Sequence, residues 1–399
     1  MSTELRASPP AALRSGLVRR FVLMSPFAEA LEVAEPGENP AVPGPQAYVR
    51  TDMGKVRYIG SKARVVDDIL GIIGPPSEGD GVFVDAFCGT GVVGAAAADL
   101  GWSVRFNDSL RSAVVVAIAR VLAASDVPFA PFGGYEAALE KLNEATPEQG
   151  FFWREYSPGG PLGRRYFTEA NAAHIDAVRG VIRAWRQESL ISQDEHSLLL
   201  ADLISSAGRV ANIAGTYGCF LSHWTSTALR PFALVARELR AEPVRHAAHC
   251  GDVTDTPMSA EDVVYFDPPY TKRQYAAYYH INETLACEDE PELVGKTGLR
   301  PWQEKASDYC YKKRALGALT SLITNAPAGR IYLSYSNEGH VALDDLEAAL
   351  SPLGELTVHE VASIGRYRPN SAASAAANAV TEYLVELQKS AVDLELVSA

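Results

Sequence analysis

The sequence lacks any uninterrupted apolar stretch of the roughly 20 residues that a membrane-spanning helix needs. Its short apolar run at residues 16–24 is broken by Arg19 and Arg20, which is not typical of a secretory signal. Cysteine is scarce as well, because the chain has only five, an odd number, and none stands in a CxxC spacing. The absence of paired cysteines predicts free thiols in a protein of the reducing cytoplasm.

Positive charge is also in deficit. The 399-residue chain carries 36 Lys and Arg against 49 Asp and Glu, which gives a formal net charge of −13. Net charge governs solubility and the distant field, whereas contact with phosphates needs only a local basic face. Two segments offer such a face, the arginine-rich stretch 151–186 and Lys312-Lys313-Arg314. Each is equally well explained as a solvated helix face.

Signals for metal or hydrolytic chemistry are weak. His246, His249 and Cys250 form an HxxHC string, but a fourth ligand at suitable spacing is missing. The serines and histidines do not stand in the glycine-rich context of a nucleophile elbow. We therefore expect neither a metal centre nor a hydrolase.

The sequence does contain the alternation of an α/β sheet. Residues 82–116 run through an apolar strand, a glycine turn, an alanine-rich helix, a second strand and a second helix. This order predicts a βαβ unit in a parallel sheet with right-handed crossovers. Later strands are expected at residues 263–266, 330–335 and 355–361, with a closing strand at 381–387.

The alternation is interrupted between residues 131 and 249, where two long helical patterns at 169–187 and 194–211 dominate. Residues 1–50 contain prolines, alanines and glycines with weak periodicity, which predicts a poorly ordered extension. The chain therefore divides into this extension, an α/β domain made of residues 51–130 and 250–399, and a mostly helical insertion at 131–249.

The most informative motif is Asp267-Pro268-Pro269-Tyr270, which directly follows the apolar strand at 263–266. Two consecutive prolines lack backbone donors and hold the chain extended, so they leave a rigid corner lined by carbonyl groups. A carboxylate, carbonyl oxygens and a flat ring suit a planar base with an exocyclic amine, which donates to the oxygens while the base stacks on the tyrosine. Alone, the string is also compatible with an ordinary turn at a strand end.

A second candidate site follows the first predicted strand and reads Asp85-Ala86-Phe87-Cys88-Gly89-Thr90-Gly91. Its glycines permit a tight turn and a close approach of the backbone to a ligand. Asp85 would repel a phosphate, so a cationic or zwitterionic ligand fits better. Asp108 ends the next strand, where nucleoside-binding sheets place an acid that binds ribose hydroxyls. Ligands bind at the carboxyl ends of such strands, which is also where Asp267 lies.

With these motifs in this order, the chain resembles the α-class, Dam-like adenine-N6 DNA methyltransferases, particularly the branch paired with type IIS restriction enzymes. Tyr58-Ile59-Gly60-Ser61-Lys62 is similar to the N-terminal motif of that family, and residues 85–91 to its S-adenosylmethionine loop. Asp108 matches the ribose-binding acid and residues 267–270 the catalytic motif. Weaker similarity extends the match over residues 56–387, through residues 165–168 with Asn171, 212–220, 278–285 and 333–339.

The resemblance implies a Rossmann-like class I methyltransferase sheet, mostly parallel with an antiparallel closing strand. It implies S-adenosylmethionine as cofactor, residues 51–130 and 250–399 as the catalytic domain, and the insertion as the region that recognises the DNA target. The catalytic residues would be Asp267, Pro268, Pro269 and Tyr270, acting on the N6 of an adenine flipped out of double-stranded DNA. The cofactor-binding residues would be Tyr58, Lys62, Asp85, Phe87, Gly89, Gly91, Asp108 and Asp252.

Other roles follow less directly from the resemblance. Asp252 stands where the family places a residue near the adenine of the cofactor, although an aspartate that caps a loop explains it equally well. The expected partners are double-stranded DNA and a cognate restriction endonuclease, with no membrane and no metal. The candidate phosphate contacts are Arg164, Arg165, Lys272 and Arg273. An aromatic cluster either buttresses the flipped base or packs in the core, and it comprises Tyr275, Tyr278 and Tyr279.

Several alternatives stay open. The first residue of the catalytic motif is usually serine in similar cytosine-N4 enzymes and asparagine in protein-glutamine enzymes, so Asp267 favours adenine. Adenine in RNA would be methylated by the same chemistry. A non-catalytic module that binds DNA or a partner and retains only the fold would be expected to lose Asp267, Tyr270, Gly89 and Gly91, which are all present here.

Overall fold

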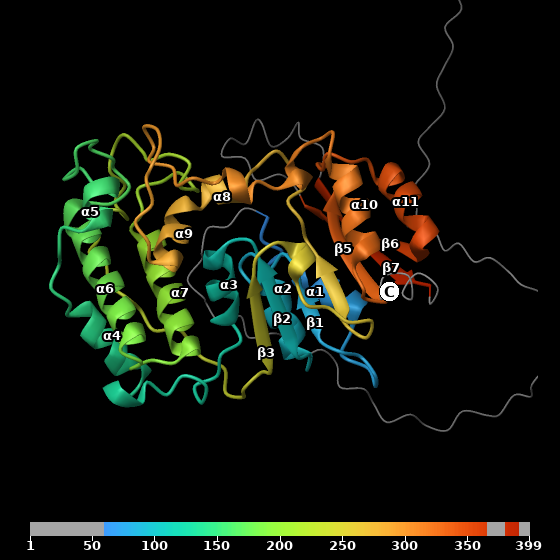
Figure 1. Cartoon of the computed structure of the whole chain (residues 1–399), viewed down its shortest axis with the longest axis horizontal. Helices are drawn as coiled ribbons and strands as arrows, with labels where there is room; N and C mark the ends of the chain where they lie inside the picture. Colours follow the sequence, from blue (N-terminus) through green and yellow to red (C-terminus); the bar gives the residue numbers. More distant parts are fainter. Residues whose placement is uncertain (1–59, 365–379, 391–399) are drawn as a thin grey trace, which may run out of the picture.

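The computed structural model describes residues 60–364 and 380–390. The predicted extension at 1–50 and the predicted cofactor residue Tyr58 lie outside the described residues. In the described part, a twisted sheet with helices on both faces adjoins a group of helices on one side (Figure 1).

Seven strands of the described residues form one sheet in the order β3-β2-β1-β4-β5-β7-β6. Along the chain they are β1 (Phe83–Asp85), β2 (Val104–Asp108), β3 (His246–Cys250), β4 (Val263–Phe266), β5 (Arg330–Ser336), β6 (Gly354–Ile364) and β7 (Val380–Lys389). The first five pair in parallel, whereas β7 lies antiparallel between β5 and β6. This topology confirms the expected Rossmann-like sheet with an antiparallel closing strand.

Strand β3 was not predicted from the sequence. It pairs in parallel with β2 at the edge of the sheet, so the sheet resumes at His246 rather than at the predicted strand 263–266. None of its five side chains is fully buried. A strand without buried side chains gives no apolar run, and the hydrophobic pattern therefore did not reveal it.

Alternate residues of the central strands pack against helices on opposite faces, as the pleat requires. On one face, Val263 and Tyr265 of β4 join a buried cluster with α1 (Val66–Ile73) and α2 (Val92–Asp99). On the other face, Val264 and Phe266 join a cluster with α10 (Ala315–Asn325) and α11 (Leu343–Leu350). Strand β4 is therefore buried on both sides, which explains its continuous apolar sequence.

The insertion contains four α-helices, and its longest two were predicted closely from their periodicity. The four are α4 (Tyr135–Asn143), α5 (Phe151–Tyr156), α6 (Glu169–Gln187) and α7 (Gln193–Arg209). Thr168 caps the start of α6 by accepting from the Asn171 N–H, and Ser192 and Glu195 form a capping box at α7. These caps satisfy amide groups that the first helical turn leaves without partners.

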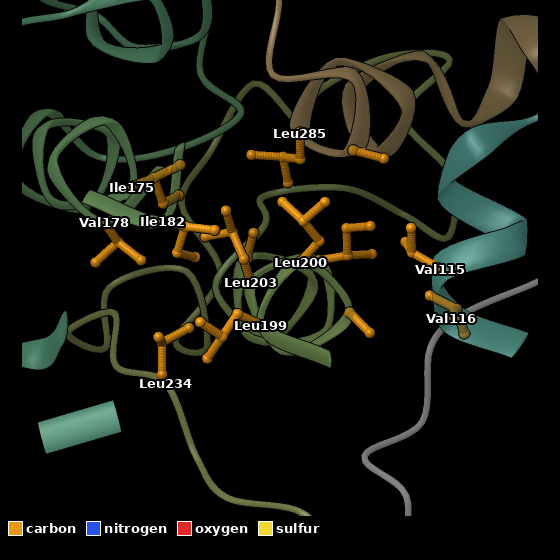
Figure 2. Packing of buried hydrophobic residues seen from close by; sticks show 14 of the residues in the cluster. Val115, Val116, Ile175, Val178, Ile182, Leu199, Leu200, Leu203, Leu234 and Leu285 are labelled. Atoms are coloured by element: carbon orange, nitrogen blue, oxygen red, sulfur yellow. The ribbon is translucent and has the colours of Figure 1, made fainter. Parts of the chain in front are cut away.

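The buried core of the insertion is shared with helices of the α/β domain. Figure 2 shows Leu200 and Leu203 of α7 between side chains from α3 (Arg111–Ile118), α6 and α9 (His280–Cys287). Val115 represents α3 in this cluster and Leu285 represents α9. The insertion therefore packs as an extension of the α/β domain, and its position relative to the sheet is fixed by apolar contacts.

No helix in the described ranges is long and apolar enough to cross a bilayer. The described residues also contain no group of three or more His, Cys, Asp or Glu arranged to hold a metal ion. Of the HxxHC string, His249 Nδ1 lies 2.8 Å from Asn107 Oδ1, and His246 Nε2 lies 3.6 Å from Asp194.

Candidate active site

Three acidic residues lie at the carboxyl ends of the three central strands. Asp85 ends β1, Asp108 ends β2 and Asp267 directly follows β4. Because β1 pairs with both β2 and β4, the three side chains line a single cavity. This is the crevice where the strand order reverses, at which open α/β sheets bind their ligands. Of the other predicted residues, the cavity is also lined by Lys62, Phe87, Gly89 and Pro269.

The turn between β1 and α2 depends on two glycines in left-handed conformations. Gly89 has φ +50° and Gly91, the N-cap of α2, has φ +71°. A Cβ atom at Gly91 would lie 2.5 Å from the Cα of Ala117 in α3, so a larger residue would push these helices apart. The glycines therefore allow both the turn and the close packing beside it.

Asp85, the last residue of β1, precedes this turn and is almost completely buried. Its carboxylate accepts a hydrogen bond from the Gly94 N–H at 3.0 Å, in the first turn of α2. Burial raises the pKa of Asp85 to about 7, and the hydrogen bond from Gly94 opposes that shift only in part. Near neutral pH, Asp85 is therefore only partly ionised and can gain charge when a cation enters the cavity.

Asp108 holds the glycine turn from the neighbouring strand. One of its oxygens accepts from the Gly89 N–H at 3.0 Å and the other from the Leu110 N–H at 2.9 Å. Burial raises the pKa of Asp108 to about 6, so the group is ionised at neutral pH. A carboxylate offers about four acceptor positions, which leaves about two of them for hydroxyl groups of a ligand.

The catalytic corner predicted after β4 contains an ion pair. Lys62 Nζ lies 3.0 Å from Asp267 Oδ1, and the side chains are 5% and 17% exposed, respectively. Burial raises the pKa of Asp267 to about 6, although Lys62 lowers it. Burial lowers the pKa of Lys62, but Asp267 and Tyr270 raise it further, so the amine stays protonated. Lys62 thus lines the expected cavity with its ammonium bound to the Asp267 carboxylate.

Tyr270 contacts the same ammonium group. Its hydroxyl is 3.2 Å from Lys62 Nζ, which also lies 5.0 Å from the centre of the ring. The ring packs against Tyr335 of β5 at 5.4 Å between centroids. The carbonyl of Tyr270 accepts from the His340 N–H at 3.0 Å, which anchors the end of the corner. These contacts hold Tyr270 in place at the corner, although Tyr270 and Pro268 are not among the residues that line the cavity.

Sequence-based prediction missed a second carboxylate at this corner. Glu382 of β7 lies 3.4 Å from Lys62 Nζ and accepts from the Tyr270 hydroxyl at 3.4 Å. The antiparallel direction of β7 brings its first residues to the edge where the parallel strands end. Nothing in the local sequence distinguishes Glu382 from an ordinary polar residue of an alternating strand.

The wall formed by residues 302–311 was also missed, because no recognisable motif occurs there. Lys305 Nζ donates to the Ser109 carbonyl at 2.7 Å and to Glu283 at 2.8 Å. Ser307 exchanges two hydrogen bonds with the side chain of Gln274, at 3.0 and 3.2 Å. Both Lys305 and Ser307 line the cavity. This wall therefore connects the loop after Asp108 with the segment that follows the catalytic corner.

Glu283 of α9 anchors this wall by accepting a hydrogen bond from Lys305. Its buried carboxylate accepts from the Arg111 N–H at 3.1 Å and the Ser112 N–H at 2.9 Å, at the start of α3. Burial raises the pKa of Glu283, but Lys305 and these donors lower it further, so the pKa lies below its ordinary value. The negative charge at the start of α3 also suits the helix dipole.

Two predicted residues behave differently from expectation. Arg164 is only 2% exposed, and its guanidinium donates to Glu155 and to the carbonyls of Gly295 and Lys296. A buried guanidinium with these partners cannot reach a phosphate, so the predicted surface role of Arg164 is wrong. Asp252 is exposed, caps the 3-10 turn η2 (Val253–Asp255), and is not among the residues that line the cavity.

The remaining candidates lie on exposed loops or around the cavity. Arg165 is exposed and donates to the Ser222 carbonyl, and Lys272 and Arg273 are exposed directly after the catalytic corner. In the aromatic cluster, Tyr279 is buried, which confirms that at least one of the three packs in the core. Tyr275, at the start of α8 (Tyr275–Tyr278), lines the cavity.

Comparison with known proteins gives a consistent result. A family model described as "D12 class N6 adenine-specific DNA methyltransferase" matches residues 58–344. Type II methyltransferase M.FokI of Planomicrobium okeanokoites is 34% identical over 341 residues, which is 84% of this chain and 53% of that protein. Modification methylase StsI of Streptococcus sanguinis is 33% identical over 298 residues, which is 73% of this chain and 45% of that protein.

A third relative has a length similar to that of this chain. Type II methyltransferase M.NlaIII of Neisseria lactamica is 30% identical over 346 residues, which is 84% of this chain and 99% of that protein. The chain thus spans about half the length of M.FokI and StsI and nearly the whole of M.NlaIII.

Proposed function

Since the chain belongs to the D12 class N6 adenine-specific DNA methyltransferase family, we propose that it methylates the exocyclic N6 of an adenine at a specific site in double-stranded DNA. The observation that carries this proposal is the single cavity shared by the glycine turn after β1 and the Asp267 corner after β4. A methyl donor and a target amine must meet at one place, and this arrangement provides it.

The residues around the cavity suit S-adenosylmethionine, a ligand with a ribose, an ammonium and a sulfonium group. Asp85 and Asp108 would face a ligand that carries positive charge, and Asp108 retains acceptor positions for ribose hydroxyls. When bound, the cofactor supplies an electrophilic methyl group. Asp85, Phe87, Gly89 and Asp108 would hold it, with support from Gly91 in the turn. Tyr58 and Lys62 enter by resemblance to the family, and so does Asp252, whose capping role explains it without a ligand.

Asp267 would act on the nitrogen of the target base. The N6 lone pair of adenine is delocalised into the ring, which makes the amine a poor nucleophile. Hydrogen bonds from the amine to the Asp267 carboxylate and the Pro268 carbonyl favour a tetrahedral nitrogen with a localised lone pair. Positive charge then develops on the nitrogen, so an anionic acceptor stabilises the transition state more than the ground state.

Tyr270 and Pro269 would complete the pocket for the flipped base. A base inside a duplex is inaccessible, so the target must leave the stack and find a new stacking surface. Tyr270 offers this surface, and its contacts with Lys62 and Tyr335 hold it in place before the base arrives. This preorganisation lowers the entropy cost of positioning the base.

Phosphate contacts are proposed for Arg165, Lys272 and Arg273, which lie on exposed loops. Lys272 and Arg273 follow the catalytic corner directly, so they would contact the backbone next to the flipped nucleotide. We further propose that the helical insertion recognises the target sequence. By resemblance to methylases of restriction–modification pairs, a cognate restriction endonuclease is the proposed partner.

The direct test is transfer of a radiolabelled methyl group from S-adenosylmethionine to unmethylated duplex DNA, followed by identification of the methylated base. The proposal expects N6-methyladenine at one recurring sequence. Label in N4-methylcytosine would indicate a cytosine-N4 methyltransferase instead. Label in RNA but not in DNA would indicate a methyltransferase that acts on adenine in RNA. DNA binding without any transfer would identify a non-catalytic binding module.

A further inference from the structure

Glu382 brings a second carboxylate to the catalytic corner from a distant part of the chain. Its position near the start of β7 places it beside Ser336 of β5, at the edge where β4 and β5 end. One oxygen lies 3.4 Å from Lys62 Nζ and the other 3.4 Å from the Tyr270 hydroxyl. The side chain is 15% exposed, so the interaction is largely shielded from water.

The charges at this corner are unequal in number. Lys62 carries one positive charge, whereas Asp267 and Glu382 carry two negative charges when both are ionised. Without Glu382, the ion pair of Lys62 and Asp267 would be neutral, and positive charge developing on the target nitrogen would meet no net negative charge. With Glu382, the cluster keeps one excess negative charge close to that nitrogen.

Glu382 also offers the ammonium group another partner. Lys62 lies 3.0 Å from Asp267, where it competes with the target amine for the same carboxylate. An ammonium group has three donors, and Asp267, Tyr270 and Glu382 all lie within reach of it. Sharing the ammonium in this way leaves acceptor capacity on Asp267 for the incoming base.

We propose that Glu382 is a positioning residue of the methyltransferase centre, which acts through Lys62 to keep Asp267 oriented and available to the target amine. This inference rests on the proposed function and adds to it a residue that the motifs do not contain. Glu382 touches neither the base nor the cofactor in this scheme, so its effect should appear in the rate and the pH dependence of transfer.

Several groups together determine how Asp267 titrates. Lys62, Glu382 and Asp85 face it with charge, and the hydroxyl groups of Tyr265, Tyr270 and Tyr275 lie around it. Among these neighbours, Glu382 raises the pKa of Asp267 and Lys62 lowers it. Removal of the Glu382 charge should therefore move the acid limb of the transfer rate to lower pH.

The test compares Glu382→Gln with Glu386→Gln as a matched control. Glu386 lies four residues further along β7 on the same face, with its side chain 21% exposed, and it pairs with His359 and the Tyr332 hydroxyl. We expect Glu382→Gln to lower single-turnover transfer about 10- to 100-fold at saturating cofactor. The cofactor Kd should change less than about twofold. The acid limb should shift to lower pH, and Glu386→Gln should retain the wild-type rate and pH profile.

A double-mutant cycle tests whether Lys62 carries the effect. In a Lys62→Met background, Glu382→Gln should cost little, because the cation that it balances is gone. This inference alone would be overturned if Glu382→Gln lowered the transfer rate equally in both backgrounds, or if the acid limb did not shift. Full activity of Glu382→Gln beside an active wild type would overturn it as well. A wild type that transfers no methyl group to DNA adenine would instead overturn the proposed function, and this inference with it.

Discussion

The proposed ribose contact of Asp108 can be tested by Asp108→Asn, which keeps the shape of the side chain and removes its charge. A hydrogen bond to a charged group is worth about 1.5–3 kcal/mol, against about 0.5–1.5 kcal/mol for a neutral one. Two ribose hydroxyls would therefore lose about 2–3 kcal/mol together, and the cofactor Kd should rise about 100-fold. In addition, the amide nitrogen cannot accept from Gly89 or Leu110, so the glycine turn loses one hydrogen bond.

The assay is equilibrium binding of S-adenosylmethionine at about pH 8, well above the pKa of about 6 at which wild-type Asp108 ionises. Asp99→Asn, at the opposite end of α2, is the matched control and should bind as the wild type does. The wild-type affinity should fall as the pH drops through about 6, and the part of this fall that is due to Asp108 should disappear in the variant. An unchanged Kd in a folded Asp108→Asn variant would refute the ribose contact.

Two further predictions concern charge in other places. Arg165→Ala should weaken DNA binding and reduce the salt slope of that binding by roughly 1. Arg164→Ala should instead lower the melting temperature and leave the salt slope unchanged. Filter binding of DNA across salt concentrations separates the two variants. The Asp85 pKa of about 7 in the folded chain lies above its unfolded value of about 4, so its stabilising contribution is complete below about pH 4 and is lost progressively as the pH rises to about 7. Asp85→Asn should therefore melt at a higher temperature than the wild type above about pH 7, and a difference independent of pH would contradict this.

The sequence allowed the sheet, its closing strand and the order of its motifs to be predicted, because buried strands carry apolar runs and their tips carry short motifs. Asp85, Asp108 and Asp267 could be placed at one edge from strand direction alone. Strand β3 lies at the edge of the sheet without a fully buried side chain, so it produced no such run. The helix α6 was placed accurately since its apolar stripe continues for 19 residues.

The parts of the site that could not be predicted depend on contacts between distant segments. Glu382 reaches the corner only because β7 inserts between β5 and β6, and Lys305 reaches the cavity through a wall without regular periodicity. Arg164 has the sequence context of a surface residue, yet carbonyls of a distant turn surround it. Such partners are determined by tertiary packing, which local patterns do not encode.

The central claim is that the Asp267 carboxylate activates the target amine in a cavity shared with the cofactor. The most direct measurement compares Asp267→Ala with the wild type in two assays, single-turnover methyl transfer to unmethylated duplex DNA and equilibrium binding of S-adenosylmethionine. We expect transfer to fall by about 1,000-fold or more, while the cofactor Kd changes less than about fivefold. Methyl transfer at a rate close to that of the wild type would contradict the assignment of Asp267.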